Sequence, residues 1–216
     1  MLSRVVFIGA AAGGGALATL VQRLTCRRLL TTARAIVVLR SPAAVAVSTL
    51  AGAGLCAALA WRIGAAPVLL ADGWVAGISP ALVGVDVLEL RLPNTLTIGS
   101  YPILGVLLAV AAAVGGDAAA LRGAGAGALV VGGFFLLVAV ASRGGLGVGD
   151  VKLAVLTAAV AGWYGLGAAI VSAIVGLLYC SIVGAIYIVT GRQSRHGRIP
   201  FGPSILAGMF TIILIH

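Results

Sequence analysis

Charged side chains are scarce in this sequence, and acidic ones are almost absent: 9% of the 216 residues are charged and only five are Asp or Glu. Hydrophobic residues make up 62%, and long apolar runs recur between the few charges. A soluble domain of this size does not need so much apolar surface, whereas runs of 18 or more apolar residues are typical of transmembrane helices. The composition therefore excludes an ordinary soluble domain and predicts a polytopic membrane protein of the all-α class.

Cysteine is also rare, and its spacing excludes two kinds of site. Cys26, Cys56 and Cys180 lie far apart with no CxxC pair, so neither a zinc site nor a disulfide framework is indicated. The net charge of +9 would suggest nucleic acid in a soluble protein. No basic stripe alternates with aromatic residues, as stacking on single strands requires, and we expect no nucleic-acid partner.

Eight apolar windows between the charges predict eight transmembrane helices in a single domain of residues 1–216. The first window follows Arg4 and resembles a signal peptide, but further spans follow it, so we expect a retained helix. The sixth is short for a full crossing of the bilayer. The windows lie at about 5–22, 42–61, 66–88, 97–114, 123–141, 151–163, 166–190 and 199–215.

Positive charges fall mainly on one side of this eight-span arrangement. The loops after the first, third, fifth and seventh spans carry eleven of the 14 Lys and Arg residues, and the opposite side carries three. Because positive residues concentrate in cytoplasmic loops, these loops are predicted to be cytoplasmic and both termini outside. The longest loop, about residues 23–41, has an apolar AIVVL core that suits contact with the lipid surface.

Two of the five acidic residues stand out by their depth in the membrane. Asp86 and Asp150 each lie at the cytoplasmic edge of a predicted span, and an acid close to hydrocarbon is costly and points to function. Asp72, near the outer end of the third span, is expected to have a structural role beside Arg62. Asp117, in an outer loop, is expected to be solvated.

Two carboxyls at the same depth can share one proton, because desolvation and like charge disfavour ionising both. This is the state that an aspartyl hydrolase needs: one carboxylate activates water while the other, protonated, donates to the carbonyl oxygen. A proton relay, or an ion pair of Asp86 or Asp150 with Arg91 or Lys152, is the alternative. The chemistry of the residues alone leaves these possibilities open.

The motifs around the two aspartates resemble those of the prepilin leader peptidases, a family of membrane-embedded aspartyl peptidases. GLGVGDVKL, ending at Leu153, is similar to the GxGD motif of that family. DVLELRLPN (86–94) resembles its first aspartate motif, IPFGPSILAG (199–208) its closing segment, and GGGALATLVQRL (13–24) its glycine-bearing first helix. The matches occur in the family's order over most of the chain, and the presenilin-like group would have PAL in place of PFGP.

The resemblance implies that Asp86 and Asp150 are the catalytic pair. It also suggests that Gly147 and Gly149 let the backbone bend and another chain segment approach Asp150. A proline ends the helix that carries Asp86, and two more break the entry to the last span. The supporting residues expected on this basis are Gly147, Gly149, Lys152, Pro93, Asn94, Pro200, Phe201, Gly202 and Pro203.

The implied activity is cleavage of the short basic leader of prepilin or pseudopilin substrates, after a glycine, at the cytoplasmic face of the bacterial inner membrane. No metal or organic cofactor is implied. Many family members carry a zinc-binding cytoplasmic insertion that accompanies N-methyltransferase activity; here the loop is short and holds only Cys26, so we expect neither. The alternative is a small proton-coupled transporter using Asp86 and Asp150 as a relay, although no inverted repeat is evident.

Overall fold

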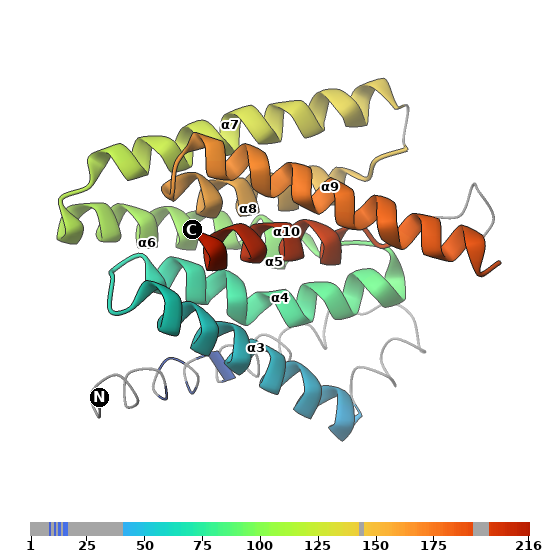
Figure 1. The fold of residues 1–216 in the computed structure, drawn as a ribbon, viewed down its shortest axis with the longest axis horizontal. Coiled ribbons are helices and arrows are strands. Elements are labelled where there is room, and N and C mark those ends of the chain that lie inside the picture. The colour runs from blue at the N-terminus through green and yellow to red at the C-terminus, as the bar shows by residue number, and fades with distance from the viewer. Residues whose placement is uncertain are drawn as a thin grey trace. The chain divides into compact units, whose positions relative to one another are not determined.

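The structure, a computed structural model, describes residues 9, 11, 13, 15, 16, 41–142, 145–191 and 199–216. Within these ranges every regular element is a helix and no strand occurs, which confirms the all-α prediction (Figure 1). The chain groups into two compact units, one of Met1–Glu89 and Pro93–Leu121, the other of Leu90–Leu92 and Arg122–His216. The predicted single domain stays a prediction.

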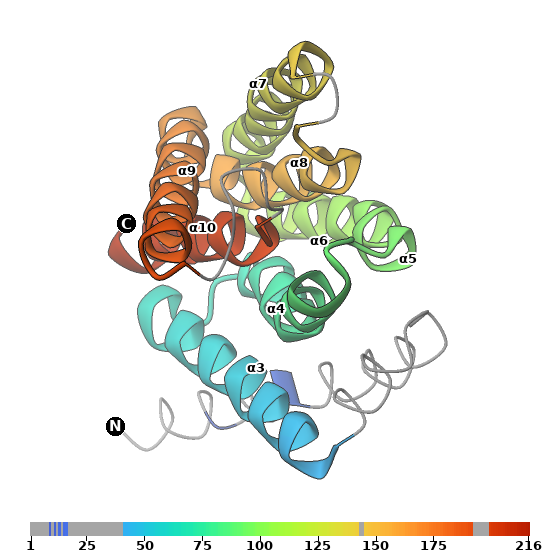
Figure 2. The ribbon, with the colours of Figure 1, turned by 90° about the vertical axis from the view of Figure 1, so that its right-hand side faces the viewer.

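The first unit is built on α3 and α4, which pack along each other (Figure 2). The hydroxyl oxygen of Ser41 caps the start of α3 by accepting from the amide of Ala44 at 3.2 Å, and Pro42 takes the first helical position. The helix α4 also contacts α6, which follows a single helical turn, α5. The helices are α3 (Pro42–Ile63), α4 (Leu69–Glu89), α5 (Asn94–Thr97) and α6 (Ser100–Gly115).

The helix α4 is the inner helix of this unit. In its most apolar window 61% of the residues are buried, against 28% in α3 and in the Asn94–Gly115 run. Its buried polar side chains are Asp72, Ser79 and Asp86. They recur every seven residues, about two helical turns, and therefore share one face. The Ser79 hydroxyl donates a hydrogen bond to the carbonyl oxygen of Val75, one turn earlier in α4, at 2.6 Å.

In the second unit, α8 packs on both α9 and α10, and α9 runs along α10 (Figure 2). Glycines allow these helices to approach closely: a β-carbon at Gly208 of α10 would lie 2.5 Å from the Ser172 carbonyl oxygen of α9, and one at Gly123 of α7 would lie 2.5 Å from the Gly162 carbonyl oxygen of α8. The helices are α7 (Ala118–Ala141, beginning in the first unit), α8 (Val148–Trp163), α9 (Leu166–Val189) and α10 (Gly202–Ile215).

Five described helical runs are long and apolar enough to cross a membrane, which supports the prediction of a membrane protein. The helices α8 and α10, with 16 and 14 residues, are shorter. The count of eight spans and the outward termini stay predictions. Apart from five helical positions, the first predicted span lies outside the described residues, as does all but residue 41 of the 23–41 loop. The five runs are Pro42–Ile63, Leu69–Glu89, Asn94–Gly115, Ala118–Ala141 and Leu166–Val189.

Candidate active site

Asp150 lies in the first turn of α8, where it caps its own helix. Gly147 is the N-cap residue, with an extended backbone (φ −69°, ψ 141°), and Asp150 is the third residue of the helix. The amide of Gly147 donates to Asp150 Oδ2 at 3.2 Å. This is the carboxylate half of a capping box, and it satisfies one backbone N–H that the start of a helix would otherwise leave without a helical partner.

The two glycines of the GxGD motif make room for different neighbours. A β-carbon at Gly147 would lie 3.0 Å from Asp150 Oδ2, so the first glycine allows the carboxylate to fold back. A β-carbon at Gly149 would lie 3.2 Å from Leu92 Cβ and 3.5 Å from its backbone nitrogen. The close approach of another chain segment, expected from the sequence, is therefore made by Leu92.

Leu92 belongs to a three-residue segment, Leu90–Leu92, that leaves α4 and joins the second unit before the chain returns to the first at Pro93. Leu90 has φ +50°, a left-handed conformation that glycine usually supplies at the end of a helix. It is the one described residue other than glycine with a positive φ. The helix thus ends before Pro93, as predicted, but the turn is made at Leu90.

Asp86 lies in the last turn of α4, and its side chain is 4% exposed. It belongs to the first unit, whereas Asp150 belongs to the second. Pro93 is buried and precedes the short helix α5 as its N-cap residue, and Asn94 is the exposed first residue of that helix. Lys152 is half-buried near the start of α8, and its predicted role stays a prediction.

The PFGP segment forms the start of α10, as the sequence predicts. Gly202 is the first helical residue and Pro203 follows in the first turn, where a missing amide hydrogen costs nothing. Pro200 precedes them in a half-buried, non-helical stretch. The ring of Phe201 lies against that of Phe135 on α7, with the centroids 6.1 Å apart. This contact holds the entry of α10 against α7.

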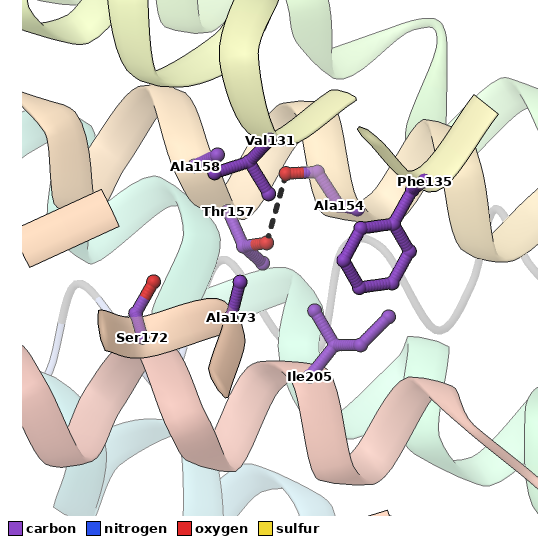
Figure 3. A pocket seen from close by; sticks show the side chains of 8 residues that line it. All are labelled: Val131, Phe135, Ala154, Thr157, Ala158, Ser172, Ala173 and Ile205. Carbon is purple, nitrogen blue, oxygen red and sulfur yellow. Dashed lines mark hydrogen bonds between the residues drawn. The ribbon is translucent and has the colours of Figure 1, made fainter. Parts of the chain in front are cut away.

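A small cavity lies inside the second unit, between α7, α8, α9 and α10 (Figure 3). Its volume is about 10 Å³, near the minimum for one water molecule and far below that of a peptide site. Thr157 and Ser172 contribute hydroxyls, which donate to carbonyls of their own helices at 2.8 to 3.2 Å. The cavity is lined by Val131, Phe135, Ala154, Thr157, Ala158, Ser172, Ala173 and Ile205.

The motifs did not point to Leu90, Leu92 or Phe135. Leucine and phenylalanine are as common in the interior of an apolar helix as beside a site, and no spacing signals a left-handed leucine. Among the described residues, no group of three or more His, Cys, Asp or Glu side chains comes together in a way that could hold a metal ion.

These observations define an α-helical membrane protein with one aspartate buried at the end of a helix and another held at the start of a helix behind two glycines. The chain belongs to the type IV leader peptidase family: the family model matches residues 74–189, more than half of its length, and the match includes both Asp86 and Asp150.

A prepilin leader peptidase/N-methyltransferase of Bacillus subtilis (strain 168) is 33% identical to the chain over 130 residues. These residues cover 60% of the chain and 49% of that protein, so the chain spans about half the length of this relative. No solved structure matches the chain.

Proposed function

We propose that this protein is a membrane-embedded aspartyl endopeptidase that removes the leader of type IV prepilin-like proteins, with Asp86 and Asp150 as its catalytic pair. The observation that carries the proposal is the location of both aspartates at helix ends inside the region that matches the family. An intramembrane carboxyl is costly and is rarely kept without a function.

A short stretch of chain links the helix of Asp86 to the segment that packs beside Asp150. Five residues separate Asp86 from Leu92, and Leu92 packs against Gly149, the residue before Asp150. The end of α4 is therefore connected by a short stretch of backbone to the segment that docks at the start of α8.

The proposed chemistry needs one aspartate as carboxylate and one as acid. The carboxylate takes a proton from water as the water oxygen attacks the scissile carbonyl carbon, and the acid gives its proton to the carbonyl oxygen. The resulting gem-diol collapses as the C–N bond breaks: the leaving nitrogen receives the proton that the first aspartate took from water, and a gem-diol hydroxyl returns a proton to the second. No metal or organic cofactor takes part in this scheme.

The proposed substrate is a prepilin or pseudopilin whose short basic leader stays in the cytoplasm while its apolar stem lies in the bilayer. Cleavage after a glycine at the cytoplasmic face of the inner membrane fits the predicted topology of eight spans with both termini outside. The name of the Bacillus subtilis relative includes both prepilin cleavage and methyl transfer. We propose cleavage alone for this chain, because its first cytoplasmic loop is short and contains only Cys26.

Co-expression with a prepilin from the same genome, followed by a gel shift of the pilin, tests the function. Wild type is expected to convert the precursor, whereas Asp86→Asn and Asp150→Asn are expected to accumulate it. Asp72→Asn is a matched control, because it makes the same change at another buried site on the same helix. Asp117→Asn is a second control: Asp117 caps α7 through the amide of Ala120 at 2.8 Å, and asparagine can keep this cap.

Membrane insertion of every variant is checked by its content in the washed membrane fraction. Cleavage by either catalytic variant at the wild-type rate would refute the aspartate pair. If wild type cleaves no prepilin and instead carries protons across proteoliposomes in an Asp86- and Asp150-dependent manner, the transporter alternative replaces the peptidase.

A further inference from the structure

We infer that the two aspartates have different, fixed roles: Asp150 is the carboxylate that deprotonates water, held in that role by the amide of Gly147, and Asp86 is the acid that protonates the scissile carbonyl. The inference rests on the proposed peptidase function and extends it. It follows from the opposite ends of α4 and α8 at which the two side chains stand.

The surroundings of Asp150 favour a negative charge. Its carboxylate lies in the first turn of α8, where the unpaired amides give the helix its positive end. The Gly147 N–H donates directly to Oδ2 at 3.2 Å, and a hydrogen bond to an ionised acceptor is stronger than one to a neutral acceptor. Gly147 thus positions one oxygen of the carboxylate and stabilises its charge.

The charged residues of the second unit that lie close to Asp150 in sequence, or in the segment that packs on its helix, are both basic. Lys152 follows two residues later on α8, and Arg91 belongs to the segment whose Leu92 packs on Gly149. The helices α9 and α10, which pack on α8, contain no acidic or basic residue. Apart from Asp150 itself, α8, α9 and α10 carry no acidic residue, so no second acid on these helices disfavours a carboxylate at this position.

The surroundings of Asp86 favour a carboxyl that keeps its proton. It lies in the last turn of α4, where the terminal carbonyls form the negative end of the helix, and it is 4% exposed. Glu89 is the last residue of the same turn, so a second acid stands one turn away. Burial, the helix end and a neighbouring acid all suit the proton-donating form.

The assigned roles balance over one turnover. Asp150 takes a proton from water, the water oxygen bonds to the carbonyl carbon, and Asp86 gives its proton to the carbonyl oxygen. Asp150 then gives its proton to the nitrogen as that nitrogen leaves with the electron pair of the C–N bond. A gem-diol hydroxyl returns a proton to Asp86, which restores the starting state and leaves a carboxylic acid and an amine.

Two substitutions at Gly147 isolate the hydrogen bond. Its φ of −69° suits proline, so Gly147→Pro removes the N–H at an acceptable backbone angle, while Gly147→Ala keeps the N–H. Both variants carry the β-carbon that would lie 3.0 Å from Asp150 Oδ2, so its effect on the carboxylate is common to both and the difference between them reports the N–H. Relative to the alanine variant, the proline variant is expected to lower kcat/KM about 10- to 100-fold, the value of a hydrogen bond to a charged group. The acidic limb of its pH–activity profile is expected to move to higher pH, because Asp150 takes up a proton more readily once the N–H of residue 147 is gone. Equal rates and equal profiles for the two variants overturn the inference.

Infrared spectroscopy of the purified full-length protein, at the pH of highest activity, tests the acid without relying on the Gly147 variants. The band of a protonated carboxyl is expected to be lost in Asp86→Asn and kept in Asp150→Asn, with Asp72→Asn identifying any contribution from that buried residue. Loss of the band in Asp150→Asn, in both catalytic variants or in neither overturns the assignment. The prepilin assay stays separate, because it requires only that both aspartates be essential.

Discussion

Leu92 occupies the space that a side chain at Gly149 would need, with 3.2 Å between Leu92 Cβ and the position of a β-carbon on residue 149. The segment that follows the helix of Asp86 is therefore packed against the residue that precedes Asp150. The second glycine of GxGD, Gly149, therefore provides the surface on which Leu92 packs.

Gly149→Ala is expected to weaken this docking. Both Gly149 and Gly133 are helical, but a β-carbon at Gly133 meets nothing within 4 Å. Alanine at 133 gains helix propensity, whereas alanine at 149 makes a contact with Leu92 that is relieved only if Leu92 shifts by a few tenths of an ångström, and overpacking of this kind costs up to about 1–3 kcal/mol. Thermal unfolding in detergent and prepilin cleavage should both fall for Gly149→Ala and hold for Gly133→Ala; equal behaviour of the two would contradict the docking role.

Leu90 is expected to become more stable as glycine. A left-handed conformation costs an L-residue about 1–2 kcal/mol, which the greater backbone entropy of glycine partly offsets. The leucine side chain is 41% exposed, so little packing is lost. Leu90→Gly should raise resistance to denaturation by up to about 1 kcal/mol, and Leu90→Val should lower it because a β-branched residue fits this region worst. A gain of stability with valine would show that the left-handed turn is absent in the membrane.

Phe135→Ala is expected to destabilise the second unit by about 3 kcal/mol or more, the usual loss for a buried phenylalanine. Phe135 is 2% exposed, whereas its neighbour Phe134 is 52% exposed. The two rings contact each other, 5.8 Å apart, so both alanine variants lose that contact and only Phe135→Ala loses Phe201. Unfolding in mixed micelles should separate the two variants clearly; similar losses would place Phe135 outside the core.

The two ends of α7 give a direct test of the predicted orientation. Ala118 and Ala141 are its first and last residues and both are exposed. In a background without Cys26, Cys56 and Cys180, a membrane-impermeant maleimide should label Ala118→Cys in intact cells and Ala141→Cys only after permeabilisation, since Arg-rich loops stay inside. The reverse pattern would invert the topology, and labelling of both would mean that α7 does not cross.

Hydropathy located the helices well and their ends less well. The windows 42–61 and 166–190 differ from Pro42–Ile63 and Leu166–Val189 by two residues or fewer at each end, because charge and glycine bound these runs. The window at 151–163 began too late. Residues 148–150 belong to α8 because Gly147 and the carboxylate of Asp150 cap its start. A hydropathy scale treats Asp150 as the end of an apolar run, so the predicted window begins after it.

The aspartates and glycines of the candidate site carry a signal in the sequence, whereas their neighbours do not. A buried acid is conspicuous in a chain with five acidic residues. Leu90 and Leu92 are of an ordinary residue type, so neither the left-handed conformation of Leu90 nor the contact of Leu92 with Gly149 leaves a pattern in the sequence. The N-cap role of Asp117, expected only to be solvated, was likewise visible in principle, since Asp is a preferred N-cap residue.

The short helices α8 and α10 are more buried than the long helices α7 and α9, and helix length decides how a membrane protein adapts to the thickness of the bilayer. The helices α8 and α10 span about 24 and 21 Å at 1.5 Å per residue, less than the bilayer's hydrocarbon core of about 30 Å, and nine residues of each are buried. The 24-residue helices α7 and α9 are mostly unburied and long enough to cross a membrane. The longer helices α7 and α9 can therefore meet a change of bilayer thickness by tilting, whereas α8 and α10 are too short to span the hydrocarbon core by themselves.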